Sequence, residues 1–409
     1  QRTRALYKTL MTDQPVLPLP VRAADLPRVE SRARTLPFLG RERALATLNA
    51  HLDRTVAGEG QMVLVSGEVG IGKTRLIDAF LHTAPHQVPQ SVSTLQGRCY
   101  AAESGAPYAM WADALQGLVG ETWQPHLADL PEVWRQQLAR LVPDLGTPAV
   151  DMQGATIDES RLRLWQGIVR TLLHVARANV LCLWFDDLHW ADEASLAMLH
   201  YVARHVSSQR IMIIGTYRSD AARDTPTLQT LLAGIPHTAI LTLSPLNVEA
   251  IDRMLQQLSD GSSYRGGTAL AQRLHQHSEG NPLFLTEAIQ TLLESEALHP
   301  GKDNQAGPLD GNAWPVPQRI QIVIQDRVAS LQEPIRRVLA AGAVIGRPFG
   351  LVLPRRVSGM PEPDVVDAVD QALNRGFLEE RSGSLTEASL TFHHSYVRRV
   401  IYEDLSTTQ

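Results

Sequence analysis

The sequence predicts an α/β fold in which helices cover a parallel sheet, and two observations support this prediction. From about residue 36 to residue 244, short apolar runs such as MVLVS and VLCLWF alternate with longer amphipathic segments. This alternation is typical of parallel strands that are joined by helices. One of the runs leads into a glycine-rich loop, and another ends in two aspartates. We therefore expect an α/β domain in this region.

Length and composition set the broad class of the protein. A chain of 409 residues is too long for one compact core, so several domains are expected. Its hydrophobic content of 44% and its charged content of 20% are typical of globular proteins. It has neither an apolar run of about 18 residues or more nor a secretory signal. We therefore expect a cytoplasmic protein without a membrane partner.

The cysteines and the charge narrow the class further. Cys99 and Cys182 are too few for a disulfide framework and have apolar neighbours, so we expect reduced core residues. The net charge of −5 gives no overall attraction to nucleic acid, although a local basic patch is compatible with it. Lysine is almost absent, because the 38 basic residues include only Lys8, Lys73 and Lys302. A lysine that persists in such a chain indicates a position that arginine cannot fill.

Four segments are expected along the chain. Residues 1–35 read as the tail of a preceding helical domain and a proline-rich linker. The α/β domain at 36–244 is followed by amphipathic segments with a period of about 3.6 residues, which predict a helical lid subdomain and a loop at 245–315. Three helices, a turn-rich hairpin and a final helix predict a winged-helix domain at 316–409.

A phosphate-binding loop is the clearest motif in the α/β domain. The sequence GEVGIGKT at 67–74 matches the Walker A pattern G-x-x-x-x-G-K-[ST], with a strand before it and a helix after it. Its glycines let backbone amides point at phosphate oxygens, and the helix presents its positive N-terminal end. Lys73 is expected to reach the β and γ phosphates, and the Thr74 hydroxyl to bind Mg²⁺. The expected nucleotide contacts here are Gly67, Gly70, Gly72, Lys73, Thr74 and Arg75.

A pair of aspartates, Asp186 and Asp187, follows the apolar run LCLWF, which has the character of a buried strand in a parallel sheet. Burying two adjacent carboxylates costs free energy unless they bind a cation or share a proton. We assign Asp186, at the strand tip of this Walker B motif, to the magnesium shell through water. Asp187 is assigned to polarising the water that attacks the γ-phosphate.

The next apolar run, RIMIIGTYR at 210–218, ends in a hydroxyl and a guanidinium. In P-loop NTPases whose Walker A and Walker B strands are separated by another strand, the end of that strand faces the γ-phosphate. Arg218 would then sense this phosphate, because its planar fork suits phosphate oxygens. A surface salt bridge is the alternative. With Lys73 and Asp187, Arg218 completes the expected catalytic set in a P-loop NTPase fold.

Five motifs resemble those of the STAND ATPases, which are signal-transducing P-loop NTPases of the AAA+-like group. The resemblance covers roughly residues 36–409 and rests on PFLGRE at 37–42, GEVGIGKTRL at 67–76, WFDDLHWAD at 184–192, GTYRSD at 215–220 and GNPLF at 280–284. It implies that the protein binds ATP or ADP with Mg²⁺ and hydrolyses ATP slowly. It also implies a closed ADP-bound monomer that opens with ATP and an inducer, and self-association in the ATP state.

The resemblance assigns residues on the adenine side of the nucleotide. Leu39, Gly40 and Arg41 match the N-terminal segment that packs against adenine. Pro282 matches the proline of the helical lid that lies beside the base. The sequence Gly-Asn-Pro is also expected to break a helix, and the two roles are compatible.

The segment FHHSYVRR at 392–399 is similar to the histidine motif of the family's winged helix. By alignment His394, rather than His393, would meet the β-phosphate of ADP in the closed form. A histidine with a purely structural role is the alternative. The family more often has an acid where Arg399 stands, so its local salt-bridge pattern is not carried over.

The chain begins at Gln1, and TRALYKTL near the start resembles the end of a bacterial transcriptional activation domain. This resemblance implies a fragment of a transcriptional regulator whose DNA-binding domain precedes it. Two other functions were weighed, namely an AAA+ ATPase that acts directly on DNA and an ATPase fused to an effector enzyme such as a cyclase or kinase. The helix expected at 361–375 has four acids and one base, which disfavours direct DNA binding. The inducer, the target promoter and the oligomer size are not encoded in any motif that we identify.

Overall fold

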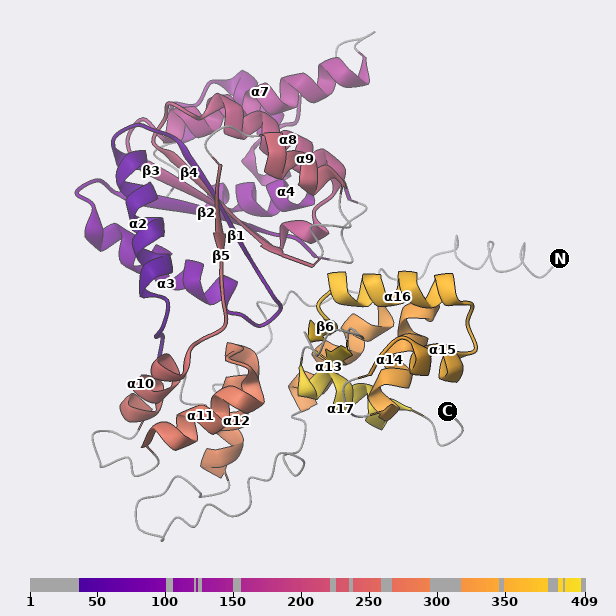
Figure 1. Cartoon of the computed structure of the whole chain (residues 1–409). Coiled ribbons are helices and arrows are strands. Elements are labelled where there is room, and N and C mark those ends of the chain that lie inside the picture. Colours follow the sequence, from indigo (N-terminus) through magenta and orange to yellow (C-terminus); the bar gives the residue numbers. More distant parts are fainter. Residues whose placement is uncertain are drawn as a thin grey trace, which may run out of the picture. The chain divides into compact units, whose positions relative to one another are not determined.

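The computed structural model covers most of the chain after the N-terminal segment (Figure 1). The predicted helix tail and linker at 1–35 lie outside the described residues, as does His393. Among the residues that are described, no helix is long and apolar enough to cross a lipid bilayer. The described residues are 37–100, 106–120, 123, 127–149, 156–220, 226–234, 238–258, 267–294, 318–345, 349–381, 389–392 and 394–405.

A five-stranded parallel sheet forms the centre of the α/β domain, as the sequence predicts. The strand order is β2-β3-β4-β1-β5, so β4 lies between the strand that leads into the phosphate loop and the strand that ends in the aspartates. The separation of the Walker A and Walker B strands is therefore confirmed. The strands are β1 (Gln61–Gly67), β2 (Val92–Arg98), β3 (Val180–Asp186), β4 (Ile211–Arg218) and β5 (Thr238–Thr242).

Burial explains why the inner strands are easy to predict from their apolar sequences. Every residue of β1 and β3 is buried, and only Arg218 at the end of β4 is partly exposed. Strands that are covered on both faces are continuously apolar. The edge strands β2 and β5 are partly exposed and have mixed sequences. Sheet position therefore accounts for the difference in hydrophobic pattern.

Two hydrophobic cores lie on opposite faces of the sheet. Alternate residues of β3 enter them, so that Leu183 joins one core and Cys182 the other. The helices α2 (Glu42–Val56) and α3 (Lys73–Gln87) contribute Leu48 and Phe80 to the second core.

The first core lies under the remaining helices of the domain (Figure 1). Both cysteines are buried and unpaired as thiols, in agreement with the sequence prediction. The helical elements of this part are α4 (Ala109–Gln116), η2 (Gly117–Val119), α6 (Glu132–Leu138), η4 (Pro143–Leu145), α7 (Ile157–Val175), η5 (Leu188–Trp190), α8 (Glu193–His205) and α9 (Pro226–Gly234).

Three helices follow the sheet, namely α10 (Val248–Leu258), α11 (Gly267–Ser278) and α12 (Pro282–Glu294). Their amphipathic sequences predict this helical part. The break between α11 and α12 contains Gly280, which has a positive φ of 75°. An added Cβ there would lie 2.2 Å from the Leu246 carbonyl oxygen, so the close approach of the two backbones requires glycine.

The C-terminal part contains α13 (Gln318–Ala329), α14 (Glu333–Ile345), α15 (Val352–Ser358) and α16 (Glu362–Asn374), then β6 (Leu378–Arg381), β7 (Ser389–Phe392) and α17 (Ser395–Asp404). The strands β6 and β7 pair antiparallel, as the hairpin prediction requires. Among the described residues of this part, four helices precede the hairpin, whereas the sequence predicts three. The additional helix α15 has only seven residues and contains Pro354, so it has little helical periodicity. The winged-helix assignment stays a prediction.

Candidate nucleotide-binding site

The loop between β1 and α3 has the backbone shape that a phosphate-binding loop needs. Gly70 and Gly72 have φ values of 76° and 94°, in the left-handed region that glycine adopts without strain. A Cβ at Gly70 would also lie 2.5 Å from the Leu283 Cβ. The helix α3 starts at Lys73, so its N-terminal amides face the loop. The fold thus places Gly67, Gly70 and Gly72 around one concave turn of backbone.

Lys73 is buried within this loop. Its Nζ donates hydrogen bonds to the carbonyl oxygens of Gly67, at 2.9 Å, and Glu68, at 2.8 Å. Burial lowers the pKa of Lys73 to about 8, and the negative charge of Asp187 opposes this shift in part. A phosphate group near Nζ would favour the charged ammonium and reverse the shift. The lysine is therefore suited to an anionic ligand.

Thr74 and Asp186 come together although 112 residues separate them in the chain. The Thr74 hydroxyl donates to Asp186 Oδ2 at 3.0 Å. Both side chains offer oxygen atoms, which are the ligands that Mg²⁺ prefers. Mg²⁺ usually keeps several waters and takes one or two protein ligands beside substrate phosphates. The pair therefore fits a magnesium site of the predicted kind.

Thr216, near the end of β4, organises both aspartates, and we did not assign it a role from the sequence. Its hydroxyl donates to Asp186 Oδ1 and accepts the backbone N–H of Asp187 at 2.9 Å. Asp187 has a φ of 59°, which is unusual for a residue other than glycine. The Thr216 hydroxyl therefore stabilises the turn that carries Asp187.

We expect Thr216→Val to destabilise the protein by about 1 to 3 kcal/mol, the usual cost of leaving buried polar groups unpaired. The substitution keeps the shape of the side chain but leaves Asp186 Oδ1 and the Asp187 N–H without this partner. Urea unfolding measures the effect. Thr216→Ser is the control, because it retains the hydroxyl. Equal stabilities of the valine and serine variants would contradict this role.

Asp187 follows Asp186 at the open end of β3, and its carboxylate is partly exposed. Burial raises its pKa, and the neighbouring charge of Asp186 raises it further. His189 lies nearby, with its Nδ1 3.8 Å from Asp187 Oδ1. Burial lowers the pKa of His189 to about 3, so its imidazole is neutral near pH 7. Within the described part of the chain, His189 Nδ1 has no hydrogen-bond partner.

Arg218 forms a bidentate ion pair with Asp220. Its Nε lies 3.2 Å from Asp220 Oδ1, and its Nη2 lies 2.7 Å from Oδ2. The pair is largely buried rather than on the open surface. Arg218 therefore forms a salt bridge, but a largely buried one and not the surface pair of the alternative, and its guanidinium lies at the end of the strand between β1 and β3. A role in sensing the γ-phosphate stays a prediction.

The segment expected beside adenine is anchored to the phosphate loop. Arg41 is buried, and its Nη1 and Nη2 donate to the carbonyl oxygens of Ser244, at 2.6 Å, and Ile71, at 2.8 Å. Gly40 has a φ of 75° and packs against α10, where a Cβ would approach Ala250 Cβ to 2.7 Å. The Arg41 guanidinium thus contacts backbone carbonyls, and a contact of Leu39, Gly40 or Arg41 with adenine stays a prediction.

Arg75 also contacts the N-terminal segment that contains Leu39 and Arg41. Its guanidinium lies over the Phe38 ring, 5.8 Å from the ring centroid. This contact joins the first turn of α3 to the residue just before Leu39. A role for Arg75 in nucleotide binding stays a prediction.

The start of α12 contacts the phosphate loop directly. Asn281 Nδ2 donates to the Val69 carbonyl oxygen at 3.0 Å, and the Leu283 backbone N–H donates to the Gly70 carbonyl oxygen at 3.2 Å. Pro282 stands between them, and its Cγ lies 4.0 Å from the position of a Cβ added at Gly72. The structure thus brings Pro282 next to the phosphate loop, and its position beside the base stays a prediction.

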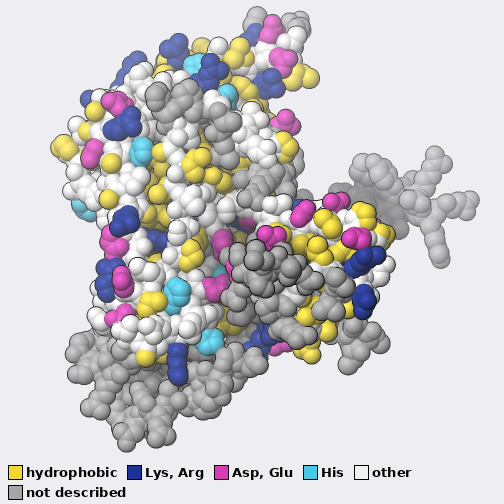
Figure 2. Space-filling view, in the orientation of Figure 1, with side chains coloured by type: hydrophobic (Ala, Val, Ile, Leu, Met, Phe, Trp, Pro, Cys, Tyr) yellow, Lys and Arg dark blue, Asp and Glu magenta, His cyan; other side chains and the backbone are white. Residues whose placement is uncertain are grey.

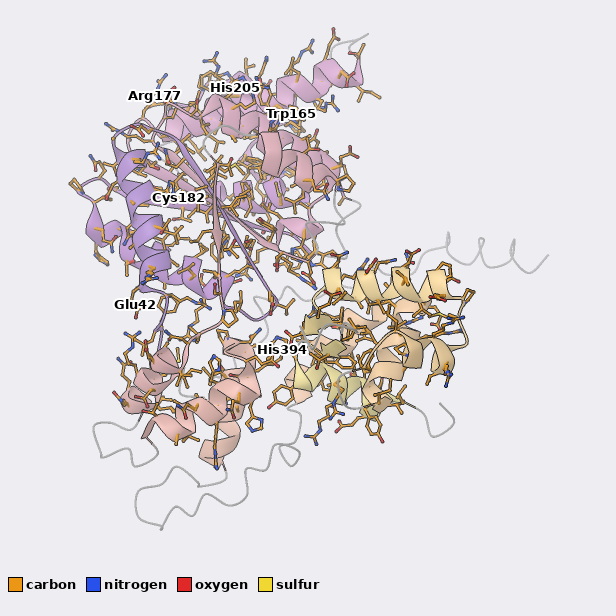
Figure 3. All side chains as sticks on the ribbon, in the orientation of Figure 1. Glu42, Trp165, Arg177, Cys182, His205 and His394 are labelled. Carbon is orange, nitrogen blue, oxygen red and sulfur yellow. The ribbon has the colours of Figure 1, made fainter. Side chains whose placement is uncertain are left out.

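His394, labelled in Figure 3, comes from the opposite end of the chain and faces the same loop. Its Nδ1 lies 2.8 Å from Glu279 Oε2, and its Nε2 lies 3.5 Å from Glu68 Oε2. The ring is buried and meets the Phe284 ring edge to face, with centroids 4.9 Å apart. His394 therefore lies beside the phosphate loop, with two carboxylates as its neighbours.

Comparison with known proteins agrees with this geometry. Residues 37–214 match the family model of the AAA ATPase domain. This part of the chain has the fold of a P-loop NTPase and is similar to the AAA ATPase domain. This domain supports nucleotide binding at the site described above.

Two solved structures are similar to this chain. The ORC2 protein of Aeropyrum pernix, in ADPNP and ADP complexes, is 13% identical with a TM-score of 0.53, over 91% of this chain and 95% of that chain. A STAND protein with a tetratricopeptide repeat sensor from Pyrococcus horikoshii is 18% identical with a TM-score of 0.35, over 95% of this chain and 45% of that one. At these identities the first likeness shows the fold alone.

A curated relative is longer than this chain. An uncharacterized protein of Rhizobium meliloti (strain 1021) is 23% identical over 398 residues, which cover 90% of this chain. The chain spans only about a third of that protein, 35% of its length.

Proposed function

We propose that this chain is the nucleotide-dependent switch of a bacterial transcriptional regulator, in which slow ATP hydrolysis resets the conformation. One observation carries the proposal: the phosphate loop is contacted by residues from both later parts of the chain. Asn281 hydrogen bonds to a loop carbonyl, and His394 faces Glu68 of the loop. A change of nucleotide would act on both contacts at once.

Binding of the nucleotide would use groups that the fold already positions. The loop amides and Lys73 would hold the phosphates, and Lys73 would exchange its carbonyl partners for phosphate oxygens. Thr74 and Asp186 would hold Mg²⁺, the latter through water. A magnesium ion at this position supplies positive charge that offsets the charge of the phosphates. The segment at 38–41 and Pro282 would border the base.

Hydrolysis would depend on Asp187 and Arg218. The Asp187 carboxylate would accept a hydrogen bond from a water molecule and orient that water toward the γ-phosphate. Arg218 would stabilise the negative charge of the transferred phosphoryl group. Because the strained turn at Asp187 is supported by Thr216, the carboxylate is held at the end of the sheet. We propose that turnover is slow and regulatory.

Direct action of this chain on DNA is disfavoured by α16, the helix best placed for recognition. Its acids Glu362, Asp364, Asp367 and Asp370 are all exposed, and Figure 2 shows acidic side chains over this helix. An acidic exposed face repels phosphates. We propose that DNA is bound by a domain outside this chain, and that the intact protein acts in the cytoplasm in response to an inducer.

The first experiment identifies the nucleotide and the assembly state. A sample of the purified protein is denatured, and the released nucleotide is identified. The mass of the native protein in solution is then measured in the presence of ADP and in the presence of a non-hydrolysable ATP analogue. We expect ADP to be released and a monomer to self-associate only with the analogue. Absence of nucleotide together with an unchanged mass would overturn the proposal of a nucleotide-dependent switch. Only the similarity to an ATPase domain would then remain.

We expect His394→Ala to release ADP about tenfold faster, because a contact beside the β-phosphate is lost and each 1.4 kcal/mol corresponds to a factor of ten. Dissociation of a fluorescent ADP analogue measures this rate. His205→Ala is the control, since His205 is exposed at the end of α8, where its ring contacts Tyr201 of the same helix. Equal rates for the two variants would contradict the assignment of His394.

A further inference from the structure

Arg327, on α13 in the C-terminal part, reaches the end of β4. Its side chain is only 15% exposed, and its Nη2 lies 3.5 Å from Asp220 Oδ2. The same nitrogen donates to the Arg375 carbonyl oxygen at 3.1 Å, and the guanidinium lies over the Phe377 ring, 4.7 Å from its centroid. The neighbours in its own part of the chain thus fix the position of Arg327, and its charge is presented to the AAA ATPase domain.

Asp220 is therefore shared by two arginines. Arg218 contacts both carboxylate oxygens through Nε and Nη2, and the Nη2 of Arg327 lies 3.5 Å from Oδ2. The side chains of Arg218 and Asp220 are only 20% and 17% exposed. Charges shielded from water interact strongly, so any change in one of these contacts alters the other.

The geometry of the Arg218–Asp220 ion pair leaves Arg218 able to bind a further anion. Asp220 occupies Nε and Nη2, and the Nη1 group of Arg218 lies outside the pair. A γ-phosphate would compete with Asp220 for the positive charge of Arg218. Arg327 weakens the hold of Asp220 on Arg218, because it takes part of the carboxylate's interaction. It also remains a partner of Asp220 when Arg218 turns toward phosphate.

The charge of Glu68 acts on Arg327 as well. The negative charges of Asp220 and Glu68 both favour its cationic form, while burial and the positive charge of Arg218 oppose it. Glu68 belongs to the phosphate loop. Arg327 is thus linked electrostatically to both the loop and the end of β4.

We propose that Arg327 is a positioning residue for the nucleotide site, which shares Asp220 with Arg218 and so sets the preference for a nucleoside triphosphate over a diphosphate. This inference rests on the proposed function, since it deepens the role of Arg218 at that site. It links the C-terminal part of the chain, through Asp220, to the guanidinium that we propose recognises the third phosphate.

The test compares the affinities of the full chain for ADP and for a non-hydrolysable ATP analogue, by calorimetry, in the wild type and in Arg327→Gln. We expect the variant to bind the analogue about tenfold more weakly, within the range of coupling between neighbouring charged residues. Its affinity for ADP should change less than about twofold. Equal losses for the two nucleotides would overturn the proposal, because a merely structural residue would affect both.

Three further variants sharpen the comparison. Arg336→Gln removes an exposed arginine that pairs with Glu333 on α14, and it should leave both affinities unchanged. In an Arg218→Gln background, Arg327→Gln should have no further effect on the ratio of the affinities. Asp220→Asn removes the competitor for Arg218 and should raise the affinity for the analogue, and this variant also tests the proposal if Arg327→Gln does not fold.

The outcomes separate this inference from the proposed function. A wild type that binds neither nucleotide would overturn the proposed function and this inference together. A wild type whose preference for the analogue is lost in Arg218→Gln but kept in Arg327→Gln would overturn the inference alone. An Arg327→Gln effect that persists without Arg218 would overturn it as well, since the proposal requires the effect to pass through Arg218.

Discussion

Lys73→Ala is expected to abolish measurable nucleotide binding, the largest effect that we predict. The buried ammonium is the group of the phosphate loop best suited to the β and γ phosphates, and alanine leaves the loop without that charge. Hydrogen bonds that involve a charged group contribute about 1.5 to 3 kcal/mol each. The loss of two of them corresponds to at least about a hundredfold loss of affinity. Calorimetry or a fluorescent nucleotide measures the change.

Arg54→Ala is a matched control for Lys73→Ala. Arg54 is an exposed base on α2 whose partner is Glu59, so its removal changes the net charge by the same amount away from the site. Circular dichroism and thermal unfolding establish that both variants are folded. Unchanged ATP affinity in folded Lys73→Ala would contradict the assignment of residues 67–74 as the phosphate-binding loop.

Asp187→Ala is expected to leave nucleotide binding intact while hydrolysis falls by more than about tenfold, the usual scale for the loss of a positioned base. The separation of the two effects follows from the geometry. Asp186 carries the contacts to Thr74 and Thr216, whereas the Asp187 side chain projects beyond them with His189 as its neighbour. Single-turnover hydrolysis of bound ATP gives the rate without a contribution from product release.

Asp192→Ala is a useful comparison for Asp187→Ala. Asp192 belongs to the same motif, but its carboxylate caps α8 by accepting the Ser195 backbone N–H at 2.8 Å. We expect its loss to lower stability by about 0.5 to 2 kcal/mol, which is typical of a helix N-cap. Normal turnover in Asp187→Ala would assign the catalytic base to another residue, with His189 the next group to replace.

Much of the α/β domain follows from the sequence because its signals are local. The inner strands are continuous apolar runs, since both faces of the sheet are covered, and the loop at 67–74 is a fixed pattern of glycines, lysine and threonine. A strand between the Walker A and Walker B strands was expected from the resemblance to P-loop NTPases of this kind, and the position of β4 between β1 and β3 confirms it. The short helix α15 was missed because seven residues with a proline give no periodicity.

The supporting residues of the site were harder to predict. Thr216 is one hydroxyl in a strand, and its importance depends on two aspartates that reach it across the sheet. Asn281 reads as part of a helix break, yet its amide contacts a loop carbonyl 212 residues earlier. Such contacts depend on how distant segments pack, and no local pattern in the chain encodes that packing.

The sequence alone therefore determined the chemical groups of the candidate site, namely the phosphate loop, the paired carboxylates and the strands that carry them. Each of these features consists of consecutive residues and can be recognised locally. Only the tertiary structure decided which charged side chains contact one another. It placed His394 beside Glu68, gave Arg218 a carboxylate partner in Asp220, and brought Arg327 to that same carboxylate across 107 residues. The reason is physical, since the energy of a charged group depends on the distance to its neighbours and on its exposure to water, and folding sets both.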